Sequence, residues 1–164
     1  MGCKRSQVRI LSPRPQLLHR TTSSVPRATL SEGGHMPAIE QLTRIEPVHL
    51  ARLQAHGLFT TGLLLERTET PTRRQTLADQ TDASPADVAE WRDEALLLNL
   101  AFFGPTEHEL LAQIGITGVT ALAATAWEAF ESAVLRAATD LHYAVPDRLA
   151  VRSWWEQGQV LVEA

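Results

Sequence analysis

A short segment of this chain occurs twice, 58 positions apart, and this internal repeat constrains the fold more than any other feature. The letters LQAHGL at residues 53–58 return as LAQIGI at residues 111–116, and each copy is followed by a threonine-rich stretch and an apolar run. Each copy later reaches a tryptophan that follows a proline, at Trp91 and at Trp154. Two small helical units that cannot each bury an apolar face can bury it against each other. The repeat therefore predicts a pseudo-two-fold pair of helical units that share one hydrophobic core.

The apolar residues of both repeats recur with the period of an α-helix, and no strand-like alternation occurs. Prolines and capping residues stand where first helical turns would begin. The expected helix starts lie near Pro47, Thr60, Pro71 and Ser84 in the first repeat and near Pro105, Thr120, Trp127 and Pro146 in the second. We therefore predict an all-α domain.

Apolar stripes at helical spacing predict which side chains form the core. One stripe comprises Val88, Trp91, Ala95 and Leu98, and another comprises Leu149, Val151 and Trp154. The next residue, Trp155, points off the second stripe, because successive helical residues are about 100° apart. We therefore expect Trp155 to be exposed, whereas Trp91 and Trp154 are expected to be buried.

The chain divides into an N-terminal tail over residues 1–38 and a helical domain over residues 39–164, with repeat one at 41–98 and repeat two at 99–161. The tail carries six basic side chains against one acidic one, together with prolines and a Ser/Thr cluster, and is predicted to be disordered. Three interpretations stay open for it: translation that begins at Met36, a solvated tail, or an arginine-rich targeting segment.

The predicted helical domain is acidic. It carries nine arginines against 18 aspartates and glutamates, within a chain of net charge −4. A domain that binds duplex nucleic acid usually has the opposite balance, because most of its affinity comes from neutralising phosphates. The charge therefore favours a protein partner, although it does not remove nucleic acid as an alternative.

Cysteine usage and hydropathy limit the setting in which the chain works. Cys3 is the single cysteine, so no intramolecular disulfide and no thiolate zinc site can form. Proteins without disulfides are common in the reducing cytoplasm. No run approaches 18 apolar residues, so no membrane span is expected. We therefore predict a cytoplasmic protein without a membrane partner.

Four segments of the sequence occur in an order that is typical of a known architecture: residues 45–58, 73–81, 88–91 and 100–116. In this order they resemble the bacterial family of domains of unknown function that carries the number 4332. The similarity covers about residues 41–161 and implies tandem helix-hairpin-helix units. In DNA-binding members of that motif class, a glycine–hydrophobic–glycine loop brings backbone N–H groups to a phosphate.

Both hairpin loops depart from this pattern. The first loop maps onto Arg44-Ile45-Glu46, which keeps the central hydrophobic residue and lacks both glycines. The second loop maps onto Phe102-Phe103-Gly104, where Phe102 replaces the first glycine. Ile45 and Phe103 are expected to act as wedges that fix each hairpin in the core. We expect the loops to preserve the fold but to have lost the ability to bind phosphate. Direct phosphate binding at Gly104 and Thr106 remains the alternative.

Two groups of basic residues are candidates for anion contacts. His49, Arg52 and His56 fall on one face of the first helix, with Arg44 nearby. An ordinary solvated face is the alternative interpretation.

Arg73 and Arg74 form the second group and lie in the first turn of a predicted helix, where the helix dipole disfavours cations. Helix stability therefore does not explain them. Two interpretations stay open: the two arginines bind a carboxylate or phosphate of a partner, or they are simply solvated.

No catalytic, metal or cofactor residues are predicted. Glu107-His108-Glu109 contains suitable side chains, but neighbouring helical residues diverge by about 100° and cannot converge on one ion. Phe102 and Trp155 are instead candidates for contact with a protein partner.

The predicted function is a non-enzymatic helix-hairpin-helix module that acts as a protein-interaction adaptor, with a DNA-associated complex as one setting. The alternative is sequence-independent nucleic-acid binding through the second hairpin and the basic helix face.

Overall fold

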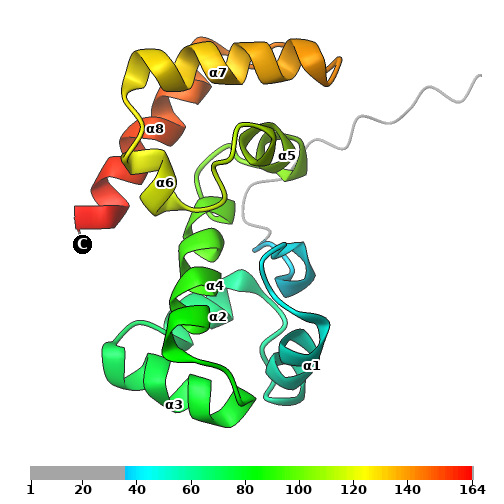
Figure 1. Cartoon of the computed structure of the whole chain (residues 1–164), viewed down its shortest axis with the longest axis vertical. Coiled ribbons are helices and arrows are strands. Elements are labelled where there is room, and N and C mark those ends of the chain that lie inside the picture. The colour runs from blue at the N-terminus through cyan, green and yellow to red at the C-terminus, as the bar shows by residue number, and fades with distance from the viewer. Residues whose placement is uncertain (1–35, 164) are drawn as a thin grey trace, which may run out of the picture. The chain divides into compact units, whose positions relative to one another are not determined.

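The computed structural model describes residues 36–163, and this part of the chain is helical, as predicted. Within it lie eight α-helices and one 3₁₀ helix, and no strand (Figure 1). The elements are η1 (Ile39–Gln41), α1 (Pro47–Ala55), α2 (Thr61–Arg67), α3 (Pro71–Thr81), α4 (Pro85–Leu98), α5 (Pro105–Gln113), α6 (Val119–Ala123), α7 (Trp127–Asp140) and α8 (Arg148–Glu163). The predictions of disorder or targeting for residues 1–35 lie outside the described residues.

Local capping chemistry sets most of the helix starts. The hydroxyls of Thr60 and Thr70 accept hydrogen bonds from backbone N–H groups three residues on, at the start of α2 and of α3. Ser84 and Asp87 form a reciprocal capping box at the start of α4: the Ser84 hydroxyl accepts from the Asp87 N–H at 3.1 Å, and the Asp87 carboxylate accepts from the Ser84 N–H at 2.9 Å. These starts agree with the sequence prediction.

The repeated glycine ends a helix in both copies. Gly57 follows α1 and Gly115 follows α5, and each has a φ of +80°. This left-handed conformation is accessible to glycine without a Cβ penalty, so it ends each helix where the repeat predicted.

The last helix differs from its prediction. It begins at Arg148 and not at Pro146, because the carboxylate of Asp147 accepts hydrogen bonds from the N–H groups of Leu149 and Ala150. Leu149 was expected in the core but is 79% exposed, since it lies on the face opposite the buried Val151.

The apolar side chains form two clusters, so the prediction of one shared core is wrong. The cluster of the first half contains Ile39, Leu42, Ile45, Leu53, Leu58, Leu64, Leu77, Ala78, Val88, Trp91, Ala95 and Leu98. The cluster of the second half contains Leu97, Leu100, Leu110, Leu111, Ile116, Val119, Leu122, Phe130, Val134, Ala137, Ala138, Val151 and Trp154. Each half therefore buries its own apolar face.

Helix α4 connects the two clusters. Leu98 lies in the first cluster and its neighbour Leu97 lies in the second. In addition, α4 packs against α2 and α3 in one half and against α6 in the other; Figure 1 labels these helices. Phe103, just beyond α4, packs against both clusters.

Residues that precede η1 are bound to the start of α2. The Thr61 N–H donates to the Pro37 carbonyl at 2.9 Å, and Ala38 pairs with Thr60 in an isolated β-bridge. Pro37 and Ala38, which the sequence placed in the tail, therefore belong to the folded part.

Removing the Trp91 side chain should strongly destabilise the first half. Trp91 is 2% exposed, so Trp91→Ala should lower the free energy of unfolding by about 3–5 kcal/mol through lost burial and a residual cavity. Urea denaturation followed by circular dichroism measures this loss. Phe59→Ala is the control: Phe59 is 56% exposed, and its loss should change stability by less than about 0.5 kcal/mol. A loss below about 1 kcal/mol for Trp91→Ala would contradict the assigned core.

Candidate functional site

The first loop is held by a buried carboxylate from α4. Glu94 is fully buried, and its Oε1 accepts from the Thr43 N–H at 2.8 Å and from the Thr43 hydroxyl at 2.6 Å. Its Oε2 accepts from the Arg44 N–H at 3.1 Å. Backbone donors of this loop are therefore paired with the protein's own buried carboxylate.

The same carboxylate reaches the second half of the domain. His108, which is buried on α5, places its Nε2 3.3 Å from Glu94 Oε1, and the two form an ion pair when the imidazole is protonated. Burial alone raises the pKa of Glu94, but His108, Thr43 and Arg44 together outweigh it and hold that pKa below its ordinary value. One side chain thus connects α4, the first loop and α5.

Loss of the Glu94 charge should destabilise the protein, and acid should have the same effect. Because the folded pKa is lowered, the stabilisation is complete above the ordinary value of 4.5 and disappears as pH falls through the folded pKa. Glu94→Gln should cost about 2–3 kcal/mol at neutral pH and should flatten the acid limb of the stability curve. Urea denaturation between neutral pH and acid measures both effects.

Glu90→Gln is the matched control for this experiment. Glu90 is also on α4, and its carboxylate pairs with Arg44 at 2.6 Å, but the glutamate side chain is 53% exposed. The exchange should therefore cost less than about 1 kcal/mol. Equal losses for Glu90→Gln and Glu94→Gln would show that the buried contacts contribute nothing specific.

The backbone of the second loop is bound by side chains of α8 and α5. The Ala101 N–H donates to Gln157 at 3.0 Å, and the Phe102 carbonyl accepts from the Trp154 indole N–H at 3.1 Å. The Gly104 N–H donates to the Glu107 carboxylate at 2.9 Å. The glycine amide that would approach a phosphate is therefore already paired with a negative charge.

The two phenylalanines of this loop have opposite environments. Phe103 is half-buried, and its ring meets the Trp154 ring edge to face with centroids 5.6 Å apart. Phe102 is 86% exposed and has a φ of +58°, the conformation in which a glycine would be favoured. Thr106, in the first turn of α5, is also exposed.

Glycine should be a more stable residue than phenylalanine at position 102. A non-glycine residue in the left-handed region costs about 1–2 kcal/mol, and the entropy of an unfolded glycine offsets part of the gain. Phe102→Gly should therefore raise the free energy of unfolding by about 0.5–1 kcal/mol, whereas Phe102→Ala should leave it unchanged within about 0.5 kcal/mol. Chemical denaturation of the two variants side by side is the measurement. A less stable glycine variant would contradict the assigned backbone conformation.

The predicted basic face of α1 is turned toward the C-terminal end of α3. Arg52 Nη1 donates to the Thr81 carbonyl at 2.7 Å and pairs with the Asp82 carboxylate at 3.1 Å. The Nε2 atoms of His49 and His56 lie within hydrogen-bond distance of the carbonyls of Asp82 and Gln80. These side chains satisfy the free carbonyls at a helix terminus, so their principal contacts are intramolecular.

Arg73 and Arg74 have an equivalent role at the C-terminal end of α2. Arg73 Nη1 donates to the Glu66 carbonyl at 3.1 Å, and Arg74 Nη1 donates to the Thr68 carbonyl at 3.0 Å. Arg92, from α4, reaches the Leu65 carbonyl at 3.2 Å. The expectation that stability does not explain Arg73 and Arg74 is therefore wrong, because the sequence did not show that α2 ends beside them.

Trp155 is half-buried and not exposed as expected. Its indole N–H donates to the Thr125 carbonyl at 2.8 Å, and its ring meets Trp127 with centroids 6.0 Å apart. Arg152 lies over both rings, 4.6 Å from the Trp127 centroid and 5.1 Å from that of Trp155. Because α8 packs against α6 and also against α7, its covered surface is wider than a single stripe.

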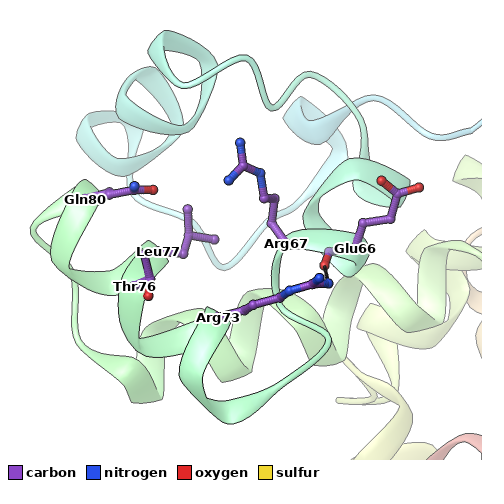
Figure 2. A pocket seen from close by; sticks show the side chains of 6 residues that line it. All are labelled: Glu66, Arg67, Arg73, Thr76, Leu77 and Gln80. Carbon is purple, nitrogen blue, oxygen red and sulfur yellow. Dashed lines mark hydrogen bonds between the residues drawn. The ribbon is translucent and has the colours of Figure 1, made fainter.

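A hollow of about 350 Å³ lies beside the turn from α2 to α3. It is lined by Glu66, Arg67, Arg73, Thr76, Leu77 and Gln80 (Figure 2). Figure 2 shows the Arg67 side chain extending into this hollow, while the Glu66 carboxylate points the other way. In the part of the chain from residue 36 to residue 163, no group of three or more His, Cys, Asp or Glu side chains is arranged to hold a metal ion.

A family model described as "Domain of unknown function (DUF4332)" matches residues 43–161. The chain belongs to this family. The match confirms the resemblance inferred from the sequence, whereas the helix-hairpin-helix details remain a prediction. No curated protein and no solved structure gives a match to this DUF4332 chain. Within residues 36–163, none of its helices combines the length and the apolar character that a bilayer crossing requires.

Sequence reasoning about this DUF4332 member missed Glu94 and Arg67. A signal for Glu94 was present, since a carboxylate stands among the buried positions of α4, three residues after Trp91 and next to Ala95. A charge on a buried stripe requires partners. No comparable signal marked Arg67, because its place at the hollow depends on how α2 and α3 meet.

Proposed function

We propose that this protein is a non-enzymatic binding module that docks onto another protein, with Phe102 at the centre of the contact. In this proposal the domain consists of two degenerate helix-hairpin-helix units, and the partner covers the second loop. The cytoplasm is the proposed setting, in keeping with a single cysteine in the chain.

The observation that carries this proposal is the combination of exposure and backbone conformation at Phe102. An aromatic ring that is 86% exposed gains almost nothing from burial, and its φ of +58° is costly for any residue with a Cβ. Folding stability therefore does not account for phenylalanine at this position. Binding does, because a protruding aromatic side chain that is desolvated by a partner is typical of the residues that dominate interface energies.

The anchor is also held in a fixed position, which favours binding. The loop backbone on both sides of Phe102 is bonded to Gln157, Trp154 and Glu107. A side chain presented from a rigid loop loses little conformational entropy when it is captured. The neighbouring Phe103 packs into both clusters and ties the loop to the core.

Two features argue against phosphate as the ligand of the loops. Amides of the first loop are bonded to Glu94, and the Gly104 amide of the second loop is bonded to Glu107. A phosphate at either place would have to displace a carboxylate and then lie beside it, which is electrostatically unfavourable. The acidic balance of the helical domain adds to this repulsion.

The proposal predicts that partner capture depends on Phe102. The full chain carrying Phe102→Ala should retain less than about one tenth of the partner captured by the wild type, as expected for a dominant interface residue. Quantitative mass spectrometry after affinity capture measures the ratio. Phe59→Ala is the control, since it removes an exposed phenylalanine that lies elsewhere, and it should leave capture intact.

Two results would overturn the proposal. One is equal capture by the wild type and by Phe102→Ala. The other is tight binding of the wild type to a short DNA duplex, with log affinity falling by about 0.9 per phosphate contact as log salt rises.

A further inference from the structure

We propose that the hollow beside the α2–α3 turn is a binding pocket for a carboxylate, presented by an acidic segment of a partner protein. This inference deepens the proposed function and rests on it for the identity of the partner, but it concerns a different surface from that of Phe102. It is carried by the contacts and charges of the arginines at this turn.

Basic side chains are concentrated here to an unusual degree. The helical domain contains nine arginines, and Arg67, Arg73, Arg74 and Arg92 all belong to the C-terminal end of α2 or contact it. Burial is the main cause that lowers the pKa of Arg92, and the nearby charge of Arg74 lowers it further. On an acidic domain, such a concentration requires a physical reason.

Intramolecular contacts account for three of these four arginines. Arg73, Arg74 and Arg92 donate to the carbonyls of Glu66, Thr68 and Leu65, which are the free acceptors at the end of α2. For Arg67, no hydrogen bond or ion pair joins its guanidinium to any part of the chain between residues 36 and 163. Its guanidinium extends into the hollow, beside the buried Leu77 (Figure 2).

The hollow therefore offers more donors than acceptors. All N–H groups of the Arg67 guanidinium are available as donors. Arg73 uses only Nη1 in its intramolecular bonds, so its other N–H groups are available too. The Gln80 side-chain amide makes no hydrogen bond within the described residues. A planar carboxylate matches the fork of a guanidinium, to which it can bind through two parallel hydrogen bonds. The volume of about 350 Å³ is at the small end for ligand sites and suits a single side chain.

The charge of the lining distinguishes a carboxylate from a phosphate. Arg73 is already paired with Glu69, and the Glu66 carboxylate points away from the hollow, so the Arg67 guanidinium supplies one uncompensated positive charge there. One carboxylate neutralises this charge. A phosphate dianion would leave a negative excess beside Glu66 and beside Glu69, which already pairs with Arg73 at 2.7 Å.

The test is a titration of the isotopically labelled full chain, followed by two-dimensional NMR. The probes are a capped tetraglutamate peptide, the neutral tetraglutamine peptide and inorganic phosphate. Tetraglutamate should give saturable shifts at Arg67, Arg73, Thr76 and Gln80, whereas tetraglutamine should give none. Phosphate should bind at least about tenfold more weakly than tetraglutamate, because the peptide places one carboxylate in the hollow and keeps the others in water, whereas a phosphate dianion brings both of its charges into the hollow.

Arg67→Gln should weaken tetraglutamate binding about tenfold, since it removes the guanidinium fork. Arg136→Gln is the matched control: it makes the same change of net charge on an exposed arginine of α7 and should leave the affinity unchanged. Tighter binding of phosphate than of tetraglutamate, or equal weakening by both variants, would overturn the proposal. Either failure would leave the Phe102 contact standing, because partner capture is measured separately.

Discussion

The carboxylate of Glu94 is removed from water at the point where three parts of the chain meet. Such burial is unfavourable for a charge unless donors replace the lost hydration, and here Thr43 and Arg44 provide them, while His108 Nε2 lies 3.3 Å from the carboxylate. The arrangement fixes the first loop against α4 and places α5 beside both. The neighbouring Asp93 extends this role, since its carboxylate accepts from the N–H and the hydroxyl of Thr120 at the start of α6.

Basic side chains of the domain donate hydrogen bonds to backbone carbonyls at helix ends, just as these carboxylates accept hydrogen bonds from backbone N–H groups of loops. Arg52, with the histidines of α1, covers the carbonyls at the end of α3, while Arg74 and Arg92 cover those at the end of α2. Short helices expose a large share of unpaired backbone groups, so a domain in which α1, α2, α5 and α6 have nine residues or fewer needs many such contacts. Several of its few cations are consequently directed at the protein's own backbone, whereas Arg67 and Arg136 make no hydrogen bond or ion pair within residues 36–163.

Helix boundaries were largely predictable from the sequence, because capping is local. Thr60, Thr70 and Ser84 act on backbone groups within three residues, and the glycine of each repeat ends its helix within the same short range. The site was less predictable, because its contacts span long intervals. Glu94 is bonded across 51 positions to Thr43, and no periodicity within α4 specifies that partner.

Exposure was predictable along an apolar stripe of a helix, but not for the residues beside the stripe. The stripe through Trp91 was correct because α4 presents that face to the first cluster. Trp155 was placed wrongly because the turn before α7 covers a second face of α8, and the position of that turn depends on tertiary packing.

Leu97 and Leu98 are consecutive in the chain, yet each is inserted into a different cluster. Unwinding the last turn of α4 would withdraw one side chain from each cluster at the same time. We therefore expect that melting of one half weakens the other and that the two halves unfold together in spite of having two interiors. A protease that cuts within this turn would be expected to release two unstable fragments, neither of which retains a complete core.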